Sequence, residues 1–547
     1  MSSEETDVLI VGGSLVGLST ALFLRLHGVS CLAVERHTGT AIHPRAGHFQ
    51  LRTVEILRAA GLEQAVRRRG EEQYHPNGGI NNVESLAGRE IASYFPNLNA
   101  GVEEFSPTVR LFIDQDALEP ILRSRGEELG AELRYRVECA SVSQDSSGVT
   151  AVLRDLDSGS ERPVRARYLV AADGNRSPVR EQLGIAMRGH GLLSNSITIY
   201  FRSEVSLAPL LEGRDQGVNY VTNPVLRGFF RLDRTGNRGF LVVNLVGDTA
   251  RPEIVAAYPS APWANVAETI DERRALELLR AAIGVPDIPV VIEDVATWRA
   301  VADSAERYQD GRVFLAGDAA HTMPPNGGFG GNTGVQDAWN LAWKLGLVLS
   351  GVAGPALLDT YDSERRPIGA LMVEQAYSRY VTRVAPYLGT EGMDPIVDDF
   401  SLEIGCRCNS PAVILEPASE DSLHEHPRES KGRPGSRAPH VVVERDGARV
   451  STLDLFGREF ALLVGPGGEA WCSATSAAAA GVGLPVDCEV IGDPQFPDAY
   501  GISPAGAVLV RPDGIVGWRA ADATGASEAS MRTTLGSLLC RTDQTGR

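Results

Sequence analysis

A short turn near the start of the chain is rich in glycine and other small residues. It lies between the apolar run "DVLIV" and the helix-like stretch "GLSTALFLRL". A turn of this kind before a helix places backbone N–H groups and the positive end of the helix dipole where a pyrophosphate can bind. The pattern therefore predicts a dinucleotide-binding turn over residues 12–17. Its members are Gly12, Gly13, Ser14, Leu15, Val16 and Gly17.

Two residues, one in the turn and one at the end of the next apolar run, indicate which dinucleotide would bind. Ser14 stands where the usual Gly-x-Gly-x-x-Gly pattern has its middle glycine, and its small side chain carries a hydroxyl that can donate to a phosphate. Glu35 ends the next apolar run, followed by Arg36, and its carboxylate can accept hydrogen bonds from ribose hydroxyls. A carboxylate there would repel a 2′-phosphate, which favours FAD or NAD over NADP. The alternative is an ordinary glycine-rich turn that binds nothing.

Two later stretches carry further candidate residues. "YLVAADGNRSPVREQLG" holds Asp173 and Gly174, and "GRVFLAGDAAHTMPPNGGFGGNTGVQDAWNLAWKL" holds Asp318 and Pro325. A glycine-rich loop lets the backbone approach a flat ring closely, and a helix that begins at the end of the loop would stabilise negative charge on that ring. The loop residues are Gly328, Gly330, Gly331 and Asn332, with the helix expected to begin near Asn332. His321 is given no role, since a structural histidine is at least as good an interpretation.

The surrounding sequence predicts the elements that position these residues. Apolar runs that alternate with helical spacing indicate one α/β domain that is split in the sequence. Between its pieces, "NSITIYFRSEV", "GFFRLDRTG" and "RGFLVVNLVG" predict an inserted antiparallel β-sheet. We expect a Rossmann-like nucleotide-binding domain at 1–75, 106–182 and 296–398, and a β-rich substrate domain at 76–105 and 183–295. A linker at 399–431 and a last α/β domain at 432–547 complete the prediction.

The composition narrows the partners. A net charge of −18 disfavours nucleic acid, and no apolar run approaches the roughly 20 residues of a membrane helix. The acidic start lacks the basic residues of a secretory signal, which predicts a cytoplasmic protein. We expect all seven cysteines to be reduced thiols, and we expect no metal site, because Cys406 and Cys408 lack a second close pair. Monomer and homodimer both remain open.

All three glycine-containing stretches, in this order and spacing, resemble the single-component FAD-dependent aromatic hydroxylases of the para-hydroxybenzoate hydroxylase type. The resemblance spans about residues 5–400 and implies FAD as the bound cofactor, NADH or NADPH as a transient reductant, and O2 as co-substrate. It further implies that Asp318 contacts the flavin ribityl chain and that Asp173 and Gly174 lie where FAD and nicotinamide meet. Gln115 would contact the flavin, Arg45 would line the cofactor channel, and Pro325 would lie over the reactive flavin carbon.

Resemblance also predicts the chemistry and the substrate. In this family a flavin C4a-hydroperoxide transfers one oxygen to a phenolic ring, and the sequence does not name the group that favours the phenolate. Residues 432–547 resemble the thioredoxin-like domain of hydroxylases that act on bacterial aromatic polyketides of the anthracycline and angucycline type. In "AWCSAT", Thr475 stands where a redox partner of Cys472 would be, so we expect no redox cysteine pair. The prediction is hydroxylation of a polycyclic phenolic polyketide in antibiotic biosynthesis.

Three alternatives remain. The first is a catabolic hydroxylase of single-ring phenols, and the second is a flavin- or ligand-binding scaffold without catalysis. The third, a flavin-dependent halogenase, is disfavoured because that class is expected to use an active-site lysine and no lysine precedes Lys344.

Overall fold

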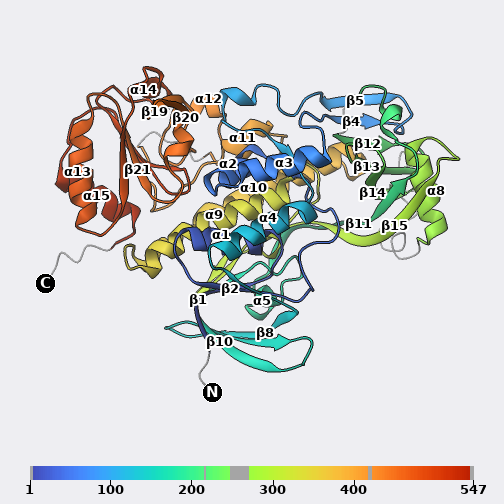
Figure 1. Ribbon diagram of the computed structural model, residues 1–547, viewed down its shortest axis with the longest axis horizontal. Coiled ribbons are helices and arrows are strands. Elements are labelled where there is room, and N and C mark those ends of the chain that lie inside the picture. Colours follow the sequence, from blue (N-terminus) through green and yellow to red (C-terminus); the bar gives the residue numbers. More distant parts are fainter. Residues whose placement is uncertain (1–3, 215–216, 247–269, 417–421, 542–547) are drawn as a thin grey trace.

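The computed structural model describes residues 4–214, 217–246, 270–416 and 422–541. Three bodies lie in a row: the C-terminal α/β part at one end, a helix-rich body with the N-terminal sheet in the middle, and a second sheet at the other end (Figure 1). Mixed sheets and helices in this arrangement confirm the predicted α/β class with an inserted β-sheet. No helix within the described residues is long and apolar enough to cross a membrane.

The first sheet grows from the predicted β-α-β unit. Strand β1 (Glu4–Val11), helix α1 (Leu15–Leu26) and strand β2 (Cys31–Glu35) follow one another, and β1 pairs in parallel with both β2 and β10 (Glu161–Ala171). The other strands are β7 (Glu132–Tyr135), β8 (Val137–Gln144), β9 (Val149–Asp155), β16 (Gln309–Asp310) and β17 (Val313–Leu315). The order β16-β17-β10-β1-β2-β7 puts the ends of β1 and β10, which precede two of the glycine stretches, side by side.

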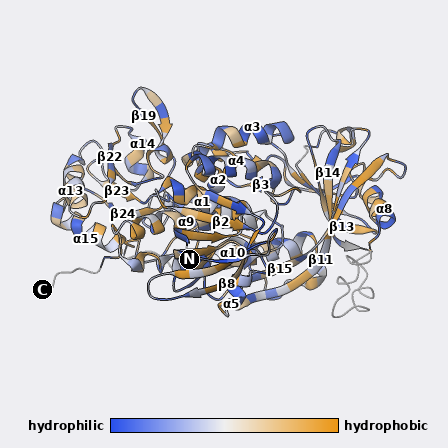
Figure 2. Ribbon diagram, turned by 60° about the horizontal axis from the view of Figure 1, so that its bottom comes forward, coloured by the Kyte–Doolittle hydropathy of each residue, from blue (hydrophilic) through white to orange (hydrophobic). Residues whose placement is uncertain are grey.

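Helices pack around this sheet and support the site. Helix α9 (Phe329–Leu349) lies between α1 and α10 (Thr360–Arg383), and their apolar residues form one buried core with the strands. The remaining elements of this body are β3 (His48–Phe49), α2 (Leu51–Ala59), α3 (Glu63–Gln73), η1 (Val102–Glu104), β6 (Leu111–Phe112), α4 (Gln115–Glu128), α5 (Pro178–Gln182), η3 (Gly317–Ala319), η4 (Pro355–Leu357) and η5 (Pro386–Leu388). Helix α3 is largely hydrophilic, as its sequence "EQAVRRRGEEQ" requires (Figure 2).

The second sheet is almost entirely antiparallel and is built around two long strands, β11 (Met187–Ser203) and β15 (Val290–Ala305). Its other strands are β4 (Ile80–Val83), β5 (Glu90–Phe95), β12 (Val218–Thr222), β13 (Leu226–Leu232), β14 (Arg238–Val246) and β18 (His321–Thr322). A short 3-10 helix, η2 (Ala208–Leu211), lies in the loop after β11. The order is β18-β15-β11-β14-β13-β12-β4-β5, and only β4 and β12 pair in parallel. Helix α8 (Glu272–Ile283) covers one face and forms an apolar core with it.

The C-terminal part contains a four-stranded sheet in the order β22-β21-β23-β24, with β21 parallel to β22 and antiparallel to β23. This topology is compatible with the predicted thioredoxin-like domain. Its strands and helices are β19 (Val442–Arg445), β20 (Ala448–Ser451), η6 (Thr452–Leu455), β21 (Phe460–Val464), α13 (Glu469–Ala480), β22 (Val486–Val490), α14 (Gln495–Ala499), β23 (Ala507–Val510), β24 (Val516–Ala520) and α15 (Glu528–Leu538). Helices α11 (Asp399–Ile404) and α12 (Pro427–Ser430) precede it.

One expectation about the cysteines is wrong. Cys472 on α13 and Cys488 on β22 form a disulfide, with their Cα atoms 5.9 Å apart. Helix α13 packs against both β21 and β22, which brings together two residues that are 16 positions apart in the sequence. Spacing alone gives no signal for such a pair, because the contact depends on how the helix crosses the sheet. The other cysteines are free.

Candidate active site

The turn over residues 12–17 is packed so tightly that glycine is required at its ends. Gly12 has φ of +109°, and a Cβ atom there would lie 2.1 Å from the carbonyl oxygen of Ala172, which directly follows the neighbouring strand β10. A Cβ on Gly17 would lie 1.8 Å from the carbonyl oxygen of Gly12, and one on Gly13 would lie 2.7 Å from Cβ of Glu35. The turn therefore brings β1, β10 and α1 into direct backbone contact.

The start of α1 is equipped to bind an anion. Ser14 is the N-cap residue but makes no capping hydrogen bond with its side chain. No hydrogen bond between described residues occupies the backbone N–H groups of Leu15, Val16 and Gly17. Free N–H groups at the positive end of a helix dipole fit a pyrophosphate.

Ser14 does not have the role that its hydroxyl first indicates. The hydroxyl donates to Oε1 of Glu119 at 2.5 Å and accepts from Nε2 of Gln115 at 2.9 Å. Glu119 is fully buried, and its other oxygen accepts from the N–H of Ala41 at 2.6 Å. The serine thus anchors the turn to α4 instead of pointing at a phosphate. Glu119 was missed in the sequence, although it lies one helical turn after Gln115.

Two more predicted residues hold loops around this turn. The side-chain oxygen of Gln115 accepts from the N–H of Ala46 at 3.2 Å. The backbone N–H of Gln115 donates to the carbonyl of Ala46 at 2.9 Å. The loop that contains exposed Arg45 is thereby fixed beside α4. Glu35 accepts from the N–H of Gly13 at 2.7 Å and, with its other oxygen, from His37 at 2.9 Å.

Glu35 is therefore oriented at the end of β2 toward the turn. The next residue, Arg36, is exposed and makes no contact with the turn in the described structure.

Asp318 lies in η3, the short turn that follows β17, at the other end of the site. Its side chain is exposed to solvent, yet desolvation by surrounding protein raises its pKa, against the opposing charges of His321 and Arg45. Accessibility together with desolvation is typical of a group that lines a concave surface. No described residue occupies its carboxylate with a hydrogen bond, so the oxygens are free to accept from a ligand hydroxyl.

Buried charges hold the backbone of the Asp318 turn. Asp337 on α9 accepts from the N–H of Gly317 at 3.1 Å and contacts Nε2 of His321 at 2.7 Å. Its other oxygen accepts from Nε of Arg365 at 2.8 Å. Burial alone would raise the pKa of Asp337, but the charges of Arg365 and His321 lower it. His321 is thus a structural residue that helps to fix the turn.

The glycine-rich loop leads into α9 slightly earlier than predicted. Gly328, with φ of +69°, is the N-cap, and exposed Pro325 opens the loop. Asn332 is buried inside the first turn, where its Nδ2 donates to the carbonyl of His48 at 2.9 Å and its Oδ1 accepts from the N–H of Gln50 at 2.9 Å. Asn332 therefore joins the loop to β3 and α2 and is not exposed to a ligand.

The smaller glycine stretches complete the site. Asp173 accepts from the N–H of Val179 at 3.2 Å, while its Oδ1 is buried without a partner and desolvation raises the pKa of the carboxyl. Gly174 has φ of +85°. A Cβ on Gly331 would approach Leu15 to 3.0 Å, which brings the glycine-rich loop, including Gly330, against the first turn of α1. A Cβ on Gly317 would likewise lie 2.7 Å from Val16, so the three predicted stretches converge on the turn over residues 12–17.

The second sheet supplies an aromatic wall through the face that α8 does not cover. Tyr200, Phe229 and Phe240 cluster there, whereas Phe201 and Phe230 lie in the core against α8. Alternate side chains along these strands thus point to opposite faces of the sheet.

Arg231 shares this wall. It stacks 4.1 Å from the ring centre of Tyr74, and its Nη1 lies 3.2 Å from Asp114. A Cβ on Gly47 would overlap Arg231, so the guanidinium touches the loop next to His48.

Comparisons with known proteins agree with this site. Residues 5–376 match the FAD binding domain model, and residues 431–541 match the aromatic-ring hydroxylase, C-terminal model. The chain is 57% identical to 4-methyl-5-nitrocatechol 5-monooxygenase of a Burkholderia species, covering 98% of each protein. It is 39% identical to tetracenomycin A2 monooxygenase-dioxygenase of Streptomyces glaucescens, over 100% of this chain and 99% of the relative.

A solved structure extends the likeness to three dimensions. The ternary complex of aklavinone-11 hydroxylase with FAD and aklavinone superposes with a TM-score of 0.91 at 37% identity, over 99% of this chain and 100% of that one. Fold and site together define an FAD-dependent monooxygenase of aromatic rings. The chain belongs to the family of FAD-dependent aromatic-ring hydroxylases. FAD is its cofactor, O2 its co-substrate and a reduced nicotinamide its reductant.

Proposed function

We propose that this monooxygenase hydroxylates a phenolate-bearing ring that binds between the glycine-rich loop and the aromatic wall of the second sheet. The observation that carries the proposal is Arg231. It is buried, and its Nε and Nη2 have no hydrogen-bond partner. An unpartnered buried N–H group costs about 1–3 kcal/mol, so these groups fit an acceptor on the substrate. A phenolate oxygen supplies both the acceptor and the opposite charge.

The surroundings of Arg231 support this orientation. Asp114 receives hydrogen bonds from Nη1 of Arg231 and from the hydroxyl of Tyr74, which lies at 2.5 Å. These contacts fix one edge of the guanidinium and leave the other edge free. The loop at Gly47 is held by Gln115 on one side and Asn332 on the other, and Nη1 of Arg231 touches it, so the guanidinium adjoins the region we propose for the flavin ring.

The proposed cofactor contacts follow from the convergence of the three glycine stretches on the turn over residues 12–17. Free N–H groups of α1 would bind the pyrophosphate, Glu35 the adenosine ribose, and Asp318 the ribityl hydroxyls. The start of α9 would face the ring, with Pro325 above it. Bound FAD supplies the redox chemistry that activates O2. The protein's part is to bind and orient both partners, exclude water, and hold the phenolate against Arg231.

For the ring system we propose a polycyclic phenol of the aromatic polyketide type. Support comes from the aklavinone-bound structure, which shares the whole fold, and from the width of an aromatic wall formed by several strands. A second candidate is a single-ring catechol with a nitro group, favoured by the 57% identity to a nitrocatechol monooxygenase. A nitro group makes a phenol more acidic, so this substrate would also present an anion to Arg231.

One substrate screen decides between the two ring systems. The holoenzyme is mixed with 4-methyl-5-nitrocatechol, simple phenols, and tri- and tetracyclic quinone phenols, and the consumption of NADH and NADPH is recorded. Mass spectrometry then tests each product for the gain of one oxygen. Polycyclic turnover supports the first candidate. Turnover of nitrocatechol with no binding of the polycyclic compounds would replace it with the second.

The role of Arg231 is tested separately. Loss of a charge-assisted hydrogen bond of about 1.5–3 kcal/mol predicts a decrease of roughly 10- to 150-fold in kcat/KM for Arg231→Met. Arg231→Lys should recover part of it. Bound FAD and the thermal unfolding temperature serve as controls. A folded, FAD-loaded Arg231→Met enzyme with normal kcat/KM would contradict the assignment.

A further inference from the structure

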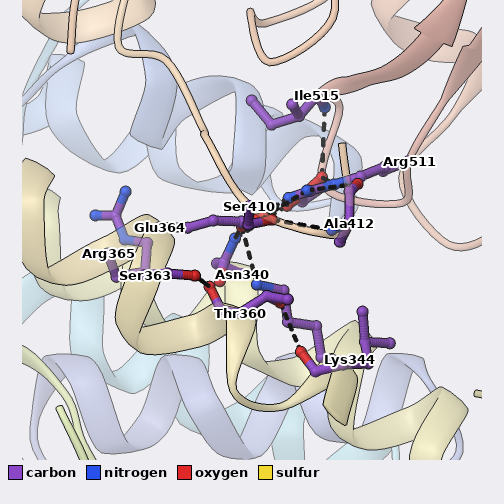
Figure 3. Close-up of polar contacts among 12 residues, drawn as sticks. Asn340, Lys344, Thr360, Ser363, Glu364, Arg365, Ser410, Ala412, Arg511 and Ile515 are labelled. Carbon is purple, nitrogen blue, oxygen red and sulfur yellow. Dashed lines mark hydrogen bonds and ion pairs between the residues drawn. The ribbon is translucent and has the colours of Figure 1, made fainter. Parts of the chain in front are cut away.

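A fully buried carboxylate on α10 joins the FAD-binding body to the C-terminal part. Glu364 accepts from Nη1 and Nη2 of Arg511 at 2.7 and 2.9 Å, and Arg511 directly follows strand β23 (Figure 3). Glu364 also accepts from the hydroxyl of Ser410 at 2.5 Å and from Lys344 at 2.9 Å. Three separate parts of the chain therefore meet at one side chain.

The network is balanced in charge. Arg511 also pairs with Asp513, so two cations, Arg511 and Lys344, face two carboxylates. Burial alone would raise the pKa of Glu364, but the charges of Arg511 and Lys344 hold it well below its usual range. Burial lowers the pKa of Lys344. Removal of one member would leave a buried charge uncompensated, which is costly.

The next residue on the same helix reaches the flavin site. Arg365 binds Asp337, the carboxylate that holds the N–H of Gly317 beside Asp318. Its Nη2 also donates to the carbonyl of Thr333 at 3.3 Å, in the first turn of α9. Glu364 and Arg365 are adjacent on one turn of α10, so a shift of the backbone in this turn would move both side chains.

We propose that the C-terminal part positions the FAD site, with Arg511 acting through Glu364 and Arg365 on the Asp318 turn and the start of α9. Arg511 is thus a positioning residue that does not touch the cofactor. It fixes the turn of α10 that carries Arg365, and Arg365 binds Asp337, which holds the backbone beside Asp318. This inference rests on FAD binding at Asp318 and is independent of which substrate is hydroxylated.

The chain contains a closely matched control pair at the same interface. Arg437, also in the C-terminal part, is buried and binds Glu55 of α2 through two nitrogen atoms. The hydroxyl of Ser106 donates to Glu55 at 2.7 Å, as that of Ser410 does to Glu364. Among the described residues, no hydrogen bond or ion pair joins Arg437, Glu55 or Ser106 directly to α10, and Arg52 links Glu55 only to the backbone carbonyl of Asp513.

The experiment compares Arg511→Met with Arg437→Met, and Ser410→Ala with Ser106→Ala. FAD is removed and restored by titration, and the dissociation constant, the visible circular dichroism of bound flavin and the unfolding temperature of the apoprotein are measured. We expect similar losses of unfolding temperature in both arginine variants. FAD affinity should decrease by about 5- to 30-fold only in Arg511→Met, with a changed flavin spectrum. Arg511→Lys should restore part of the affinity.

The serine variants keep the test decisive if an arginine variant does not fold. Ser410→Ala should weaken FAD binding by about 2- to 5-fold, whereas Ser106→Ala should leave it unchanged. Equal effects of the two bridges on FAD affinity would overturn the proposal, because the C-terminal part would then act only by docking. Unchanged affinity in both Ser410→Ala and a folded Arg511→Met would overturn it as well.

Discussion

The two faces of the second sheet are made by the same strands but have different tasks. Toward α8, residues such as Ile199, Phe201 and Phe230 are completely buried among apolar neighbours. Toward the flavin site, the alternating positions carry Tyr200, Phe229 and Arg231, and buried polar atoms there have no partner in the protein. The first face is complete without a ligand, whereas the second is incomplete. Positions that stabilise the fold and positions that we propose to bind the substrate therefore alternate along each strand.

The sharpest test of this separation substitutes two adjacent phenylalanines. Phe230→Ala should reduce the free energy of unfolding by about 3–5 kcal/mol, because it opens a cavity in the core against α8. Phe229→Ala should cost much less stability but should raise KM for the substrate. Thermal unfolding and steady-state kinetics measure the two effects. Equal loss of stability in both variants would show that the two faces are not distinct.

A second test concerns Asp318, which belongs to the incomplete surface. Asp318→Ala should weaken FAD binding by roughly 1.5–3 kcal/mol, since a charge-assisted hydrogen bond to the ligand is lost. The apoprotein should unfold at an unchanged or slightly higher temperature, because a desolvated carboxylate is removed. Flavin titration and calorimetry are the measurements. A large loss of apoprotein stability would assign Asp318 to the scaffold.

Acid should lower the free energy of unfolding through His48, which lies beside the proposed site. Burial, with Arg110 and Arg231 nearby, lowers the pKa of His48 to about 3, so the imidazole is neutral in the fold. The unfolded chain takes up a proton below about pH 6.5, so the free energy of unfolding should decrease as the pH falls from there toward 3. In His48→Gln this decrease should be shallower. Exposed His37→Gln is the control, and identical pH profiles for both variants would contradict the assignment.

The smallest effect is expected at Ser14. Because its hydroxyl binds Glu119, Ser14→Gly should change FAD affinity by less than about tenfold, or roughly 1.4 kcal/mol. Glu119→Gln provides the comparison: it removes the charge and keeps only one of the two accepting oxygens, so the hydrogen bond from Ser14 or the one from Ala41 is lost. A loss beyond tenfold in Ser14→Gly alone would mean that the hydroxyl contacts the cofactor directly.

Sequence reasoning predicted the parts of the site that are local. The turn at 12–17 and the glycine-rich loop owe their shapes to neighbouring residues, and the α/β class and the inserted sheet followed from periodicity. The partners that hold these parts could not be predicted. Ser14 and Glu119 are 105 residues apart, Arg231 and Asp114 are 117 apart, and Arg511 and Glu364 are 147 apart. Such pairs depend on the packing of whole elements, and no single stretch of sequence records them.

The disulfide is another contact that sequence spacing alone could not predict. A search for two cysteines separated by two residues finds nothing at Cys472, because its partner Cys488 lies on the adjacent strand β22. The parallel pairing of β21 and β22 requires α13 to cross over the sheet, and the packing of α13 on β22 then brings the two cysteines together.

The long ribbon formed by β11 and β15 has a mechanical consequence. The two strands are paired from Met187 and Ala305 at one end to Ser203 and Val290 at the other, a length of about 50 Å at the usual rise per residue. Near its first end, β15 pairs with β18, which directly follows the Asp318 turn. Farther along, the ribbon carries Tyr200 of the aromatic wall.

Because one paired ribbon joins both regions, a small tilt of the aromatic wall would be transmitted to the Asp318 turn. The ribbon can yield at its three register shifts, between Gly189 and Gly191, Leu192 and Ser194, and Tyr200 and Phe201. Stiffening these joints should make the enzyme less tolerant of substrates of different size.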